Sequence, residues 1–426
     1  MAYDYDFAVA GGGPGGSSAA IALAQRGHSV VMFERETFPR FHIGESLLST
    51  ANDAFAALGL ADRIDDQSFA EKWGALLISH DGAVKRRIDF AGVTEVRRPQ
   101  TWQVWRALFD RILLDRAREV GVDVRQRHRV NSCEFTPDAA IVEFAGDGAP
   151  PDRVRVRAIV DATGRHGLIA RKFNLRNAEP RLANVAIFSH YSGVPRIDDV
   201  RPDDIRIISR DDAGWFWLIP LSRDVMSVGV VVPKDLLLQM PGESNEERLE
   251  QAINGTPAVA ELMRNAFREA AVRVEKDFSY RASAYAGDRW ILVGDAGSFL
   301  DPVFSTGVSI AMESGIEAAA ELDRALKRDA FHARTFAAFS RRQRRRYETF
   351  RRFVIAFYSP QFRDLFFTPK LPKPLFRAMA TVLSGRWNAS LRTRLLNHLF
   401  FALVAVQKHV RFSTPHFRRD ASAGYP

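Results

Sequence analysis

The sequence predicts an α/β fold, in which a Rossmann-type unit carries an inserted, mostly antiparallel β-sheet and a helical C-terminal region. Three observations predict it. Residues 7–34 follow the pattern of a strand, a glycine-rich turn, a helix and a second strand. Residues 171–281 contain several runs of β-branched and aromatic residues with strand periodicity. Residues 346–426 are basic, rich in Phe and patterned like helices.

The chain has 426 residues, of which 46% are hydrophobic and 26% charged, as is ordinary for a globular protein of two or three units. We expect a discontinuous nucleotide-binding unit, a sheet unit that binds the substrate and a C-terminal helical unit. Their expected bounds are 1–75, 101–170 and 280–345 for the first, 76–100 and 171–279 for the second, and 346–426 for the third.

Several classes of site and partner are not expected. The single cysteine, Cys133, excludes an internal disulfide and a thiolate metal cluster, and we expect no metal. The N-terminus lacks the pattern of a signal peptide, and the apolar run Leu399 to Val406 is too short for a bilayer, so we expect a cytoplasmic chain without a membrane span. The net charge is +9, with an arginine cluster at 341–352. No nucleic-acid motif accompanies it, which leaves a solvated helix face or a docking site for an acidic protein or phosphate groups.

The first elements are predicted by local signals. Phe7–Ala10 is a short apolar strand, and the helix after the glycine-rich turn ends at Gly27, a favoured residue after a helix. Ser29–Glu34 is the second strand. Further helices are expected at 46–58, 101–120 and 308–326. Further strands are expected at 122–124, 154–160 and 290–295, and in the inserted sheet at 185–192, 205–209, 215–221 and 226–232.

The glycine-rich turn has the spacing Gly11-x-Gly13-x-x-Gly16 in the context that a dinucleotide requires. Gly11 allows the tight turn, Gly13 lets the backbone approach a pyrophosphate, and Gly16 lets the helix pack on the strand. The helix N-terminus offers free N–H groups to the phosphates. Glu34, at the end of the second strand, is placed to accept hydrogen bonds from the ribose hydroxyls.

Two later segments decide between NAD and FAD. Asp161-Ala162-Thr163-Gly164 and Gly294-Asp295-Ala296 each follow a predicted strand, although Asp295 alone could be a helix N-cap. With the glycine-rich turn, these pieces resemble the FAD monooxygenase superfamily over most of the chain. The resemblance implies that FAD is the cofactor. It further implies that the FAD-binding residues are Gly11, Gly13, Pro14, Gly16, Glu34, Arg35, Ser46, Arg106, Asp161, Gly164, Asp295 and Gly307.

A sharper resemblance rests on four segments, with support from the helical tail at 357–360 and 383–385. Residues 38–46 read Phe-Pro-Arg-Phe-His-Ile-Gly-Glu-Ser, and residues 71–75 read Glu-Lys-Trp-Gly-Ala. Residues 215–220 fit Trp-x-Trp-x-Ile-Pro, and residues 304–308 read Phe-Ser-Thr-Gly-Val. Together they resemble the flavin-dependent halogenases, and the resemblance covers nearly the whole chain.

This resemblance implies that reduced FAD and O₂ oxidise a halide ion to hypohalous acid. It implies that Thr306 and Gly307 bind the halide through backbone N–H groups. It makes Lys72 the catalytic residue, which hydrogen-bonds hypohalous acid or forms a chloramine if its amine is neutral. Trp215, Trp217, Ile219 and Pro220 would form a barrier between flavin and substrate, because alternate residues of a strand share a face.

One departure from the family pattern concerns the substrate. Tryptophan halogenases carry a glutamate just before the Ser-Thr-Gly turn, and here that residue is Phe304. The sequence therefore resembles the halogenases of phenols and pyrroles in secondary metabolism, many of which act on substrates tethered to an acyl or peptidyl carrier protein. Carrier proteins are acidic, so the basic C-terminal helices are a candidate contact. Glu45 and the histidines His42 and His166 receive no role at this point.

Alternatives stay open. The chain shows no second dinucleotide fingerprint, so we expect reduced FAD from a separate flavin reductase, although single-component hydroxylases also lack one. An aromatic monooxygenase or a reductase of the same superfamily would share the fold and FAD, with Lys72 and the tryptophan pair dispensable. A non-catalytic flavin-binding protein with a basic interaction tail is the third alternative.

Overall fold

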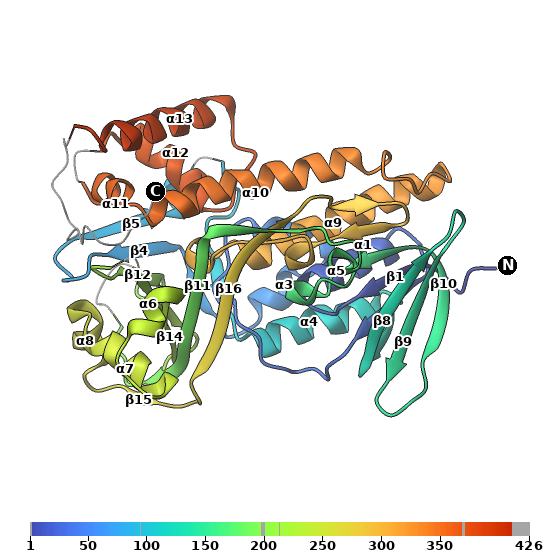
Figure 1. The fold of residues 1–426 in the computed structure, drawn as a ribbon, viewed down its shortest axis with the longest axis horizontal. Coiled ribbons are helices and arrows are strands. Elements are labelled where there is room, and N and C mark those ends of the chain that lie inside the picture. The colour runs from blue at the N-terminus through green and yellow to red at the C-terminus, as the bar shows by residue number, and fades with distance from the viewer. Residues whose placement is uncertain (1, 94, 197–200, 213, 369–370, 411–426) are drawn as a thin grey trace.

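The computed structural model describes residues 2–93, 95–196, 201–212, 214–368 and 371–410, except for the side chains of residues 277 and 278. Two large β-sheets lie beside each other, with helices packed against them (Figure 1). The C-terminal helices form a separate layer over the second sheet and along one side of the first (Figure 1). The α/β class predicted from the sequence is confirmed.

The first sheet has the strand order β17-β18-β10-β1-β2-β7, with β8 and β9 attached through β10. From β18 to β7 its neighbours run parallel. The core strand β1 (Tyr5–Ala10) is buried at its C-terminal half, and its Phe7 aligns with Val30 and with Ala158. The other strands are β2 (Val30–Glu34), β7 (Asp123–Gln126), β8 (His128–Phe135), β9 (Ala140–Gly146), β10 (Asp152–Asp161), β17 (Ala286–Gly287) and β18 (Trp290–Leu292).

Small residues allow two helices beside this sheet to pack closely against each other. Helix α1 (Pro14–Ala24) lies between β1 and β2 in the chain and contacts α9 (Gly307–Lys327). A side chain at Gly315 of α9 would place its Cβ 2.4 Å from the carbonyl oxygen of Gly15, so the contact requires glycine. The other helices near this sheet are α2 (Ala51–Leu58), α3 (Ala61–Asp65), α4 (Arg106–Glu119) and α5 (Leu168–Lys172).

The second sheet has the order β19-β16-β11-β14-β13-β12-β4-β5, with β15 paired to β11. All its pairs are antiparallel except β4 with β12. The strands are β4 (Gly74–Ile78), β5 (Lys85–Asp89), β11 (Arg176–Ser192), β12 (Ile205–Ser209), β13 (Trp215–Pro220), β14 (Met226–Pro233), β15 (Phe267–Arg268), β16 (Arg273–Ala282) and β19 (Ser298–Phe299). The mostly antiparallel inserted sheet is therefore confirmed, and the exact three-part division of the chain stays a prediction.

The C-terminal helices are α10 (Ala337–Phe357), α11 (Pro360–Phe367), α12 (Lys373–Leu383) and α13 (Leu391–Val406). Their buried side chains share one hydrophobic core with the second sheet, in which Trp215 of β13 packs against Phe357 of α10. No helix in the described ranges is long and apolar enough to cross a bilayer.

Three expectations about elements were wrong. Residues 46–50 are not helical, because Ser46 pairs with Gln103 and the Leu47 N–H donates to the Trp102 carbonyl at 3.0 Å. Thr101–Gln103 form the strand β6, which pairs with β3 (Ala70–Lys72), so the helix expected at 101–120 begins at Arg106. The inserted segment also contains three helices that were not expected, α6 (Lys234–Gln239), α7 (Asn245–Asn254) and α8 (Pro257–Met263).

Candidate active site

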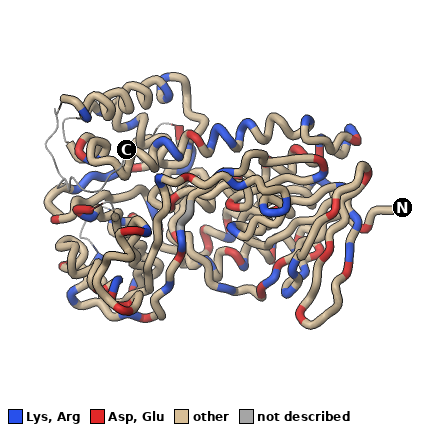
Figure 2. Tube along the Cα trace, in the orientation of Figure 1, with Lys and Arg blue, Asp and Glu red and all other residues tan. Residues whose placement is uncertain are grey.

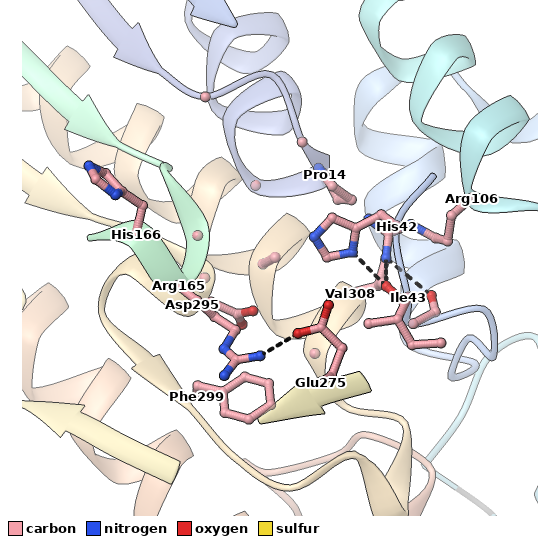
Figure 3. A pocket seen from close by; sticks show the side chains of 18 of the residues that line it. Pro14, His42, Ile43, Arg106, Arg165, His166, Glu275, Asp295, Phe299 and Val308 are labelled. Carbon is pink, nitrogen blue, oxygen red and sulfur yellow. Dashed lines mark hydrogen bonds and ion pairs between the residues drawn. The ribbon is translucent and has the colours of Figure 1, made fainter. Parts of the chain in front are cut away.

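One cavity of about 920 Å³ connects the first sheet with the second. Its lining begins at the glycine-rich turn after β1 and extends to the tryptophans of β13 and the start of α9. Figure 3 shows Pro14, His42 and Arg106 on one side of this cavity, and Arg165, Asp295 and Phe299 on another. The cavity therefore joins the segments on which the two sequence resemblances rest.

The glycine-rich turn has the geometry that its spacing predicts. Gly11 has a φ of 102°, a region that favours glycine. A Cβ at Gly16 would lie 1.8 Å from the Gly11 carbonyl oxygen, so Gly16 packs directly on the turn. Gly13 is the N-cap of α1 and lines the cavity, where a Cβ would meet only the Arg40 guanidinium, at 3.7 Å. The turn thus leaves room for a ligand at the N-terminus of α1.

Glu34 closes the other side of this turn. Its Oε2 accepts a hydrogen bond from the Gly12 N–H at 2.7 Å, and its Oε1 accepts from the Glu36 N–H at 2.9 Å. The side chain is buried yet lines the cavity next to Arg35. Each oxygen keeps a further lone pair, so Glu34 can still accept bonds from ribose hydroxyls.

Arg106, at the start of α4, fixes the loop of residues 38–46 against the cavity. Its guanidinium pairs with Asp110 through two bonds of 2.8 and 2.9 Å, and it donates to the carbonyls of Ile43 and Gly44. The same figure shows these bonds to the loop (Figure 3). His42 on this loop lines the cavity, where enclosure by the walls and the charge of Arg106 lower the pKa of its imidazole, although the residue stays exposed to the cavity.

The two aspartates assigned to FAD differ in their surroundings. Asp295 lines the cavity, and its carboxylate has no hydrogen-bond partner within the described residues; burial raises its pKa to about 6. Asp161 does not line the cavity. Its carboxylate accepts bonds from Thr163 and from the Ile169 N–H, so it shapes the turn that presents Gly164.

These features fit FAD. A cradle without side chains lies at Gly13, a further open position lies at Gly307, where a Cβ would meet no atom within 4 Å, and Asp295 offers an unpaired carboxylate to a hydroxyl group. We infer that Gly13, Glu34 and Asp295 contact the cofactor, whereas Gly16 and Asp161 support the backbone behind it.

Lys72 is fully buried at the end of β3 and does not itself line the cavity. Its Nζ donates to the Ser46 Oγ at 2.8 Å and to the Leu47 carbonyl at 2.7 Å. Ser46 does line the cavity, so a single hydroxyl separates the amine from the open space. Desolvation lowers the pKa of Lys72 to about 7, although the charge of Asp204 acts in the opposite direction.

The segment before α9 brings backbone donors to the cavity. Ser305 has a φ of 56° and turns the chain into α9, of which Thr306 is the N-cap. The first N–H groups of a helix have no acceptor within the helix, and Thr306, Gly307 and Val308 line the cavity. This arrangement suits a small anion.

The tryptophan pair lies on one face of β13. Trp215, Trp217 and Ile219 line the cavity, and the two indole rings lie 6.1 Å apart between centroids. Trp217 donates from Nε1 to the Ser227 hydroxyl at 3.1 Å. Pro220 ends the strand and does not line the cavity, so its part in the predicted barrier is indirect.

A buried polar cluster behind Trp215 was not predicted. The Trp215 Nε1 donates to the Tyr358 hydroxyl at 2.9 Å, and that hydroxyl donates to the Asp301 carboxylate at 2.6 Å. Asn184 donates to both Asp301 and Tyr358, at 2.8 and 2.9 Å. Burial raises the pKa of Asp301, and these donors oppose that shift. The cluster connects β13 with the segment before α9 and with the end of helix α10. The family motifs contained no signal for it except the Tyr-Ser-Pro of the tail.

Glu45 received no role from the sequence and lies at the wall between Ser46 and the second sheet. Its Oε1 lies 2.9 Å from the His190 Nε2, and its Oε2 is buried without a hydrogen-bond partner. His190 in turn packs edge-on against Trp105. A buried carboxylate oxygen without a partner at a cavity wall is a candidate contact for a ligand.

Substitution of Glu34 with Ala is expected to weaken FAD binding about 10- to 100-fold, because it removes the ribose acceptor and the bond that holds Gly12. The measurement is a fluorescence titration of FAD into the apoprotein. Glu261→Ala, an exposed glutamate on α8, is the matched control and should bind FAD like the parent protein. Equal affinities for both variants would remove Glu34 from the cofactor site.

Substitution of Tyr358 with Phe is expected to lower the free energy of unfolding by about 1–3 kcal/mol, because the Trp215 N–H loses its acceptor and Asp301 loses a donor. Urea unfolding measures the change. Tyr191→Phe is the control, because the hydroxyl of this buried tyrosine has no hydrogen-bond partner among the described residues and its loss should change stability little. An unchanged Tyr358→Phe protein would mean that water replaces the hydroxyl at no cost.

Comparison with known proteins gives consistent results. The family model described as tryptophan halogenase matches residues 6–77 and 83–382. The "1H-pyrrole-2-carbonyl-[peptidyl-carrier protein] brominase" of Pseudoalteromonas luteoviolacea is 35% identical over 329 residues, which are 76% of this chain and 78% of that protein. The "1H-pyrrole-2-carbonyl-[peptidyl-carrier protein] chlorinase" of Pseudomonas fluorescens is 28% identical over an alignment that covers 95% of this chain and 94% of that protein.

A solved structure agrees with this similarity. The flavin-dependent brominase Bmp2 superposes with a TM-score of 0.84 at 29% identity, covering 95% of this chain and all of that one. The family match spans most of the chain, including the glycine-rich turn, Lys72, the tryptophan pair and the segment before α9. The chain therefore belongs to the flavin-dependent halogenases and is an FAD-dependent enzyme.

Proposed function

We propose that the protein halogenates an electron-rich phenolic or pyrrolic substrate, tethered to an acidic carrier protein, with O₂, a halide ion and FADH₂ from a separate reductase. One observation carries the proposal. A single cavity joins the dinucleotide turn to the anion-accepting segment at Thr306 and Gly307, and the wall of that cavity contains Ser46, behind which Lys72 is buried.

FAD, when bound and reduced, supplies the two electrons with which O₂ and a proton convert halide to hypohalous acid and water. Gly13 and the start of α1 would hold its pyrophosphate, Glu34 its ribose, and Asp295 a further hydroxyl. The N–H groups of Thr306 and Gly307 would hold the halide at the N-terminus of α9, where the helix dipole favours an anion.

The hypohalous acid would then reach Lys72 at the part of the cavity wall that Ser46 forms. With a pKa of about 7, its amine exists in both forms near neutral pH. The ammonium can donate a hydrogen bond to the oxygen of hypohalous acid, and the free amine can displace hydroxide to form a haloamine. Either species delivers an electrophilic halogen to the ring, which releases a proton.

The substrate class is supported by the relatives, whose names state that they act on pyrrole-2-carbonyl groups on a peptidyl carrier protein. Phe304 precedes the anion segment, does not line the cavity and packs edge-on against Phe357, so this position supplies no carboxylate. Trp215 and Trp217 would exclude the substrate from the flavin, which favours halogenation over direct oxygen transfer.

The test is halogen incorporation detected by mass spectrometry. The reaction contains the protein, FAD, a flavin reductase with NADH, chloride or bromide, and phenols and pyrroles offered free, as thioesters and on carrier proteins. We expect the halogen isotope pattern on a carrier-bound product. A product that gains only oxygen, with or without halide, would instead establish the aromatic monooxygenase alternative.

A further inference from the structure

The outer face of α13 is apolar and exposed. Leu391, Leu395, Leu399 and Val406 are between 48 and 64% exposed, and their spacing places them on one side of the helix. The opposite side, with Thr393, Asn397, Phe400 and Val404, is buried against the protein. A helix that is apolar on both sides is normally enclosed, so this face is expected to have a partner.

Charge surrounds this face in an uneven way. Between residues 331 and 410 the sequence has sixteen Lys and Arg residues and two Asp and Glu residues, so this part exceeds the net charge of the whole chain. Figure 2 shows Lys and Arg along α10 and on α13, with few acidic residues near them. On α13, Arg392 and Arg394 are exposed and make no ion pair within the described ranges.

Two occupants within the protein itself are disfavoured. Residues 411–426 carry a net positive charge, so they do not complement the basic part of this face. A second copy of the chain would have to pair the same face in a symmetric dimer, which would bring two basic surfaces together. An acidic partner with an apolar contact surface satisfies both features.

A chain of packed aromatic side chains connects α13 with the candidate active site. Phe400 and Phe401, on the inner side of α13, contact Phe362 and Phe353 with centroid distances of 5.5 and 4.9 Å. Phe357, on the same helix as Phe353, packs against Trp215 at 6.4 Å and Phe304 at 5.7 Å. A protein bound on α13 would therefore contact the same helical layer that packs against Trp215.

We propose that the exposed face of α13, formed by Leu391, Leu395, Leu399 and Val406 with Arg392 and Arg394, is the docking surface for the acidic carrier protein that presents the substrate. The proposal rests on the proposed function for the identity of the partner. The leucines would supply buried apolar contact area, and the arginines would accelerate and orient the encounter.

The first test is binding, which does not depend on turnover. A fluorescently labelled, unloaded peptidyl carrier protein is titrated with the parent protein, with Arg392→Glu/Arg394→Glu and with Leu395→Glu/Leu399→Glu. Each variant is expected to raise the Kd about tenfold or more, and the parent Kd should rise with salt concentration. Arg341→Glu/Arg345→Glu makes the same change in net charge on the exposed side of α10 and should leave the Kd nearly unchanged.

Activity then separates this inference from the proposed function. With the acyl group that the protein halogenates, the α13 variants should raise KM for the loaded carrier and leave kcat/KM for the matching pantetheine thioester unchanged. Halogenation of both forms with no effect of the α13 variants would overturn the docking surface and uphold the halogenase. Carrier binding through α13 without any halogenation would uphold the docking surface and overturn the proposed halogenase function. An equal loss in the α10 control would also overturn the proposal.

Other occupants give different results. Light scattering that shows a dimer of the parent protein and a monomer of Leu395→Glu/Leu399→Glu would assign the face to a second copy. Binding to anionic phospholipid vesicles that the same variant abolishes would assign it to a membrane surface. An equal fall in melting temperature on deletion of residues 411–426 and in Leu395→Glu/Leu399→Glu would assign it to the end of the chain. Each of these outcomes would overturn the proposal.

Discussion

Substitution of Lys72 with Met should reduce halogenation by at least about a thousandfold, while FAD binding and the oxidation of FADH₂ by O₂ continue. The loss of halogenation and the retained flavin chemistry both follow from where Lys72 lies. The Lys72 amine lies behind Ser46 and does not line the cavity, whereas Gly13, Glu34 and Asp295, which are placed on the cofactor, all line it. Loss of the amine would therefore leave hypohalous acid formed but not directed to the substrate.

The measurements are product formation by mass spectrometry and consumption of O₂ or FADH₂ in the same reaction. Lys172→Met, an exposed lysine at the end of α5, is the control and should retain full activity. Continued halogenation by Lys72→Met at close to the parent rate would remove the lysine from the mechanism. A parallel loss of FADH₂ oxidation would show instead that the substitution damages the flavin site.

The same variant should be more stable than the parent protein near neutral pH. Folding lowers the pKa of Lys72 to about 7 from 10.5, so between these values the unfolded chain binds more protons than the folded one. The parent protein therefore loses stability as the pH falls from about 10.5 to 7, and the penalty is fully present below 7. Met has a similar length and no charge, so the substitution removes this penalty. It also removes the hydrogen bonds to Ser46 and Leu47. Urea unfolding of both proteins should show a difference of about 1–4 kcal/mol at pH 6.5 that shrinks towards pH 10. A lysine kept at such a cost is better explained by function than by stability.

The sequence predicted what local pattern controls and missed what distant residues decide together. The glycine-rich turn follows from steric rules that act within six residues, and the structure places Gly11 and Gly16 accordingly. Residues 46–50 and 101–103 carry helical patterns, but Ser46 pairs with Gln103 and residues 101–103 pair with β3, so neither segment is helical. The contacts of Asp301 with Asn184 and Tyr358 join residues 117 and 57 positions apart, and periodicity contains no information about such pairs. The burial of Lys72 also depends on residues distant in the sequence, namely β6 and the loop that ends at Ser46.

Alanine at Gly16 and alanine at Gly13 should both weaken FAD binding, for different physical reasons. The Gly16 Cβ would lie 1.8 Å from the Gly11 carbonyl oxygen and 3.1 Å from the Ala162 Cβ, so α1 must move away from the turn. We expect a loss of about 3 kcal/mol or more in the free energy of unfolding, together with loss of FAD affinity. The Gly13 Cβ would meet only the Arg40 guanidinium at 3.7 Å, and Gly13 has an ordinary φ of −69°. Gly13→Ala should therefore fold normally.

The two variants distinguish loss of FAD binding caused by a destabilised fold from loss caused by a blocked cofactor site. Thermal unfolding without FAD should show a lower melting temperature for Gly16→Ala only, and FAD titration should show weaker binding for both. The expected loss for Gly13→Ala is about 10-fold or more, because its methyl group would occupy the space at the N-cap of α1 that the pyrophosphate needs. If Gly13→Ala binds FAD like the parent protein, the pyrophosphate does not approach this N-cap. The cofactor would then have to lie farther along the cavity, towards Asp295, and Gly13 would lose its assigned role while Gly16 keeps its own.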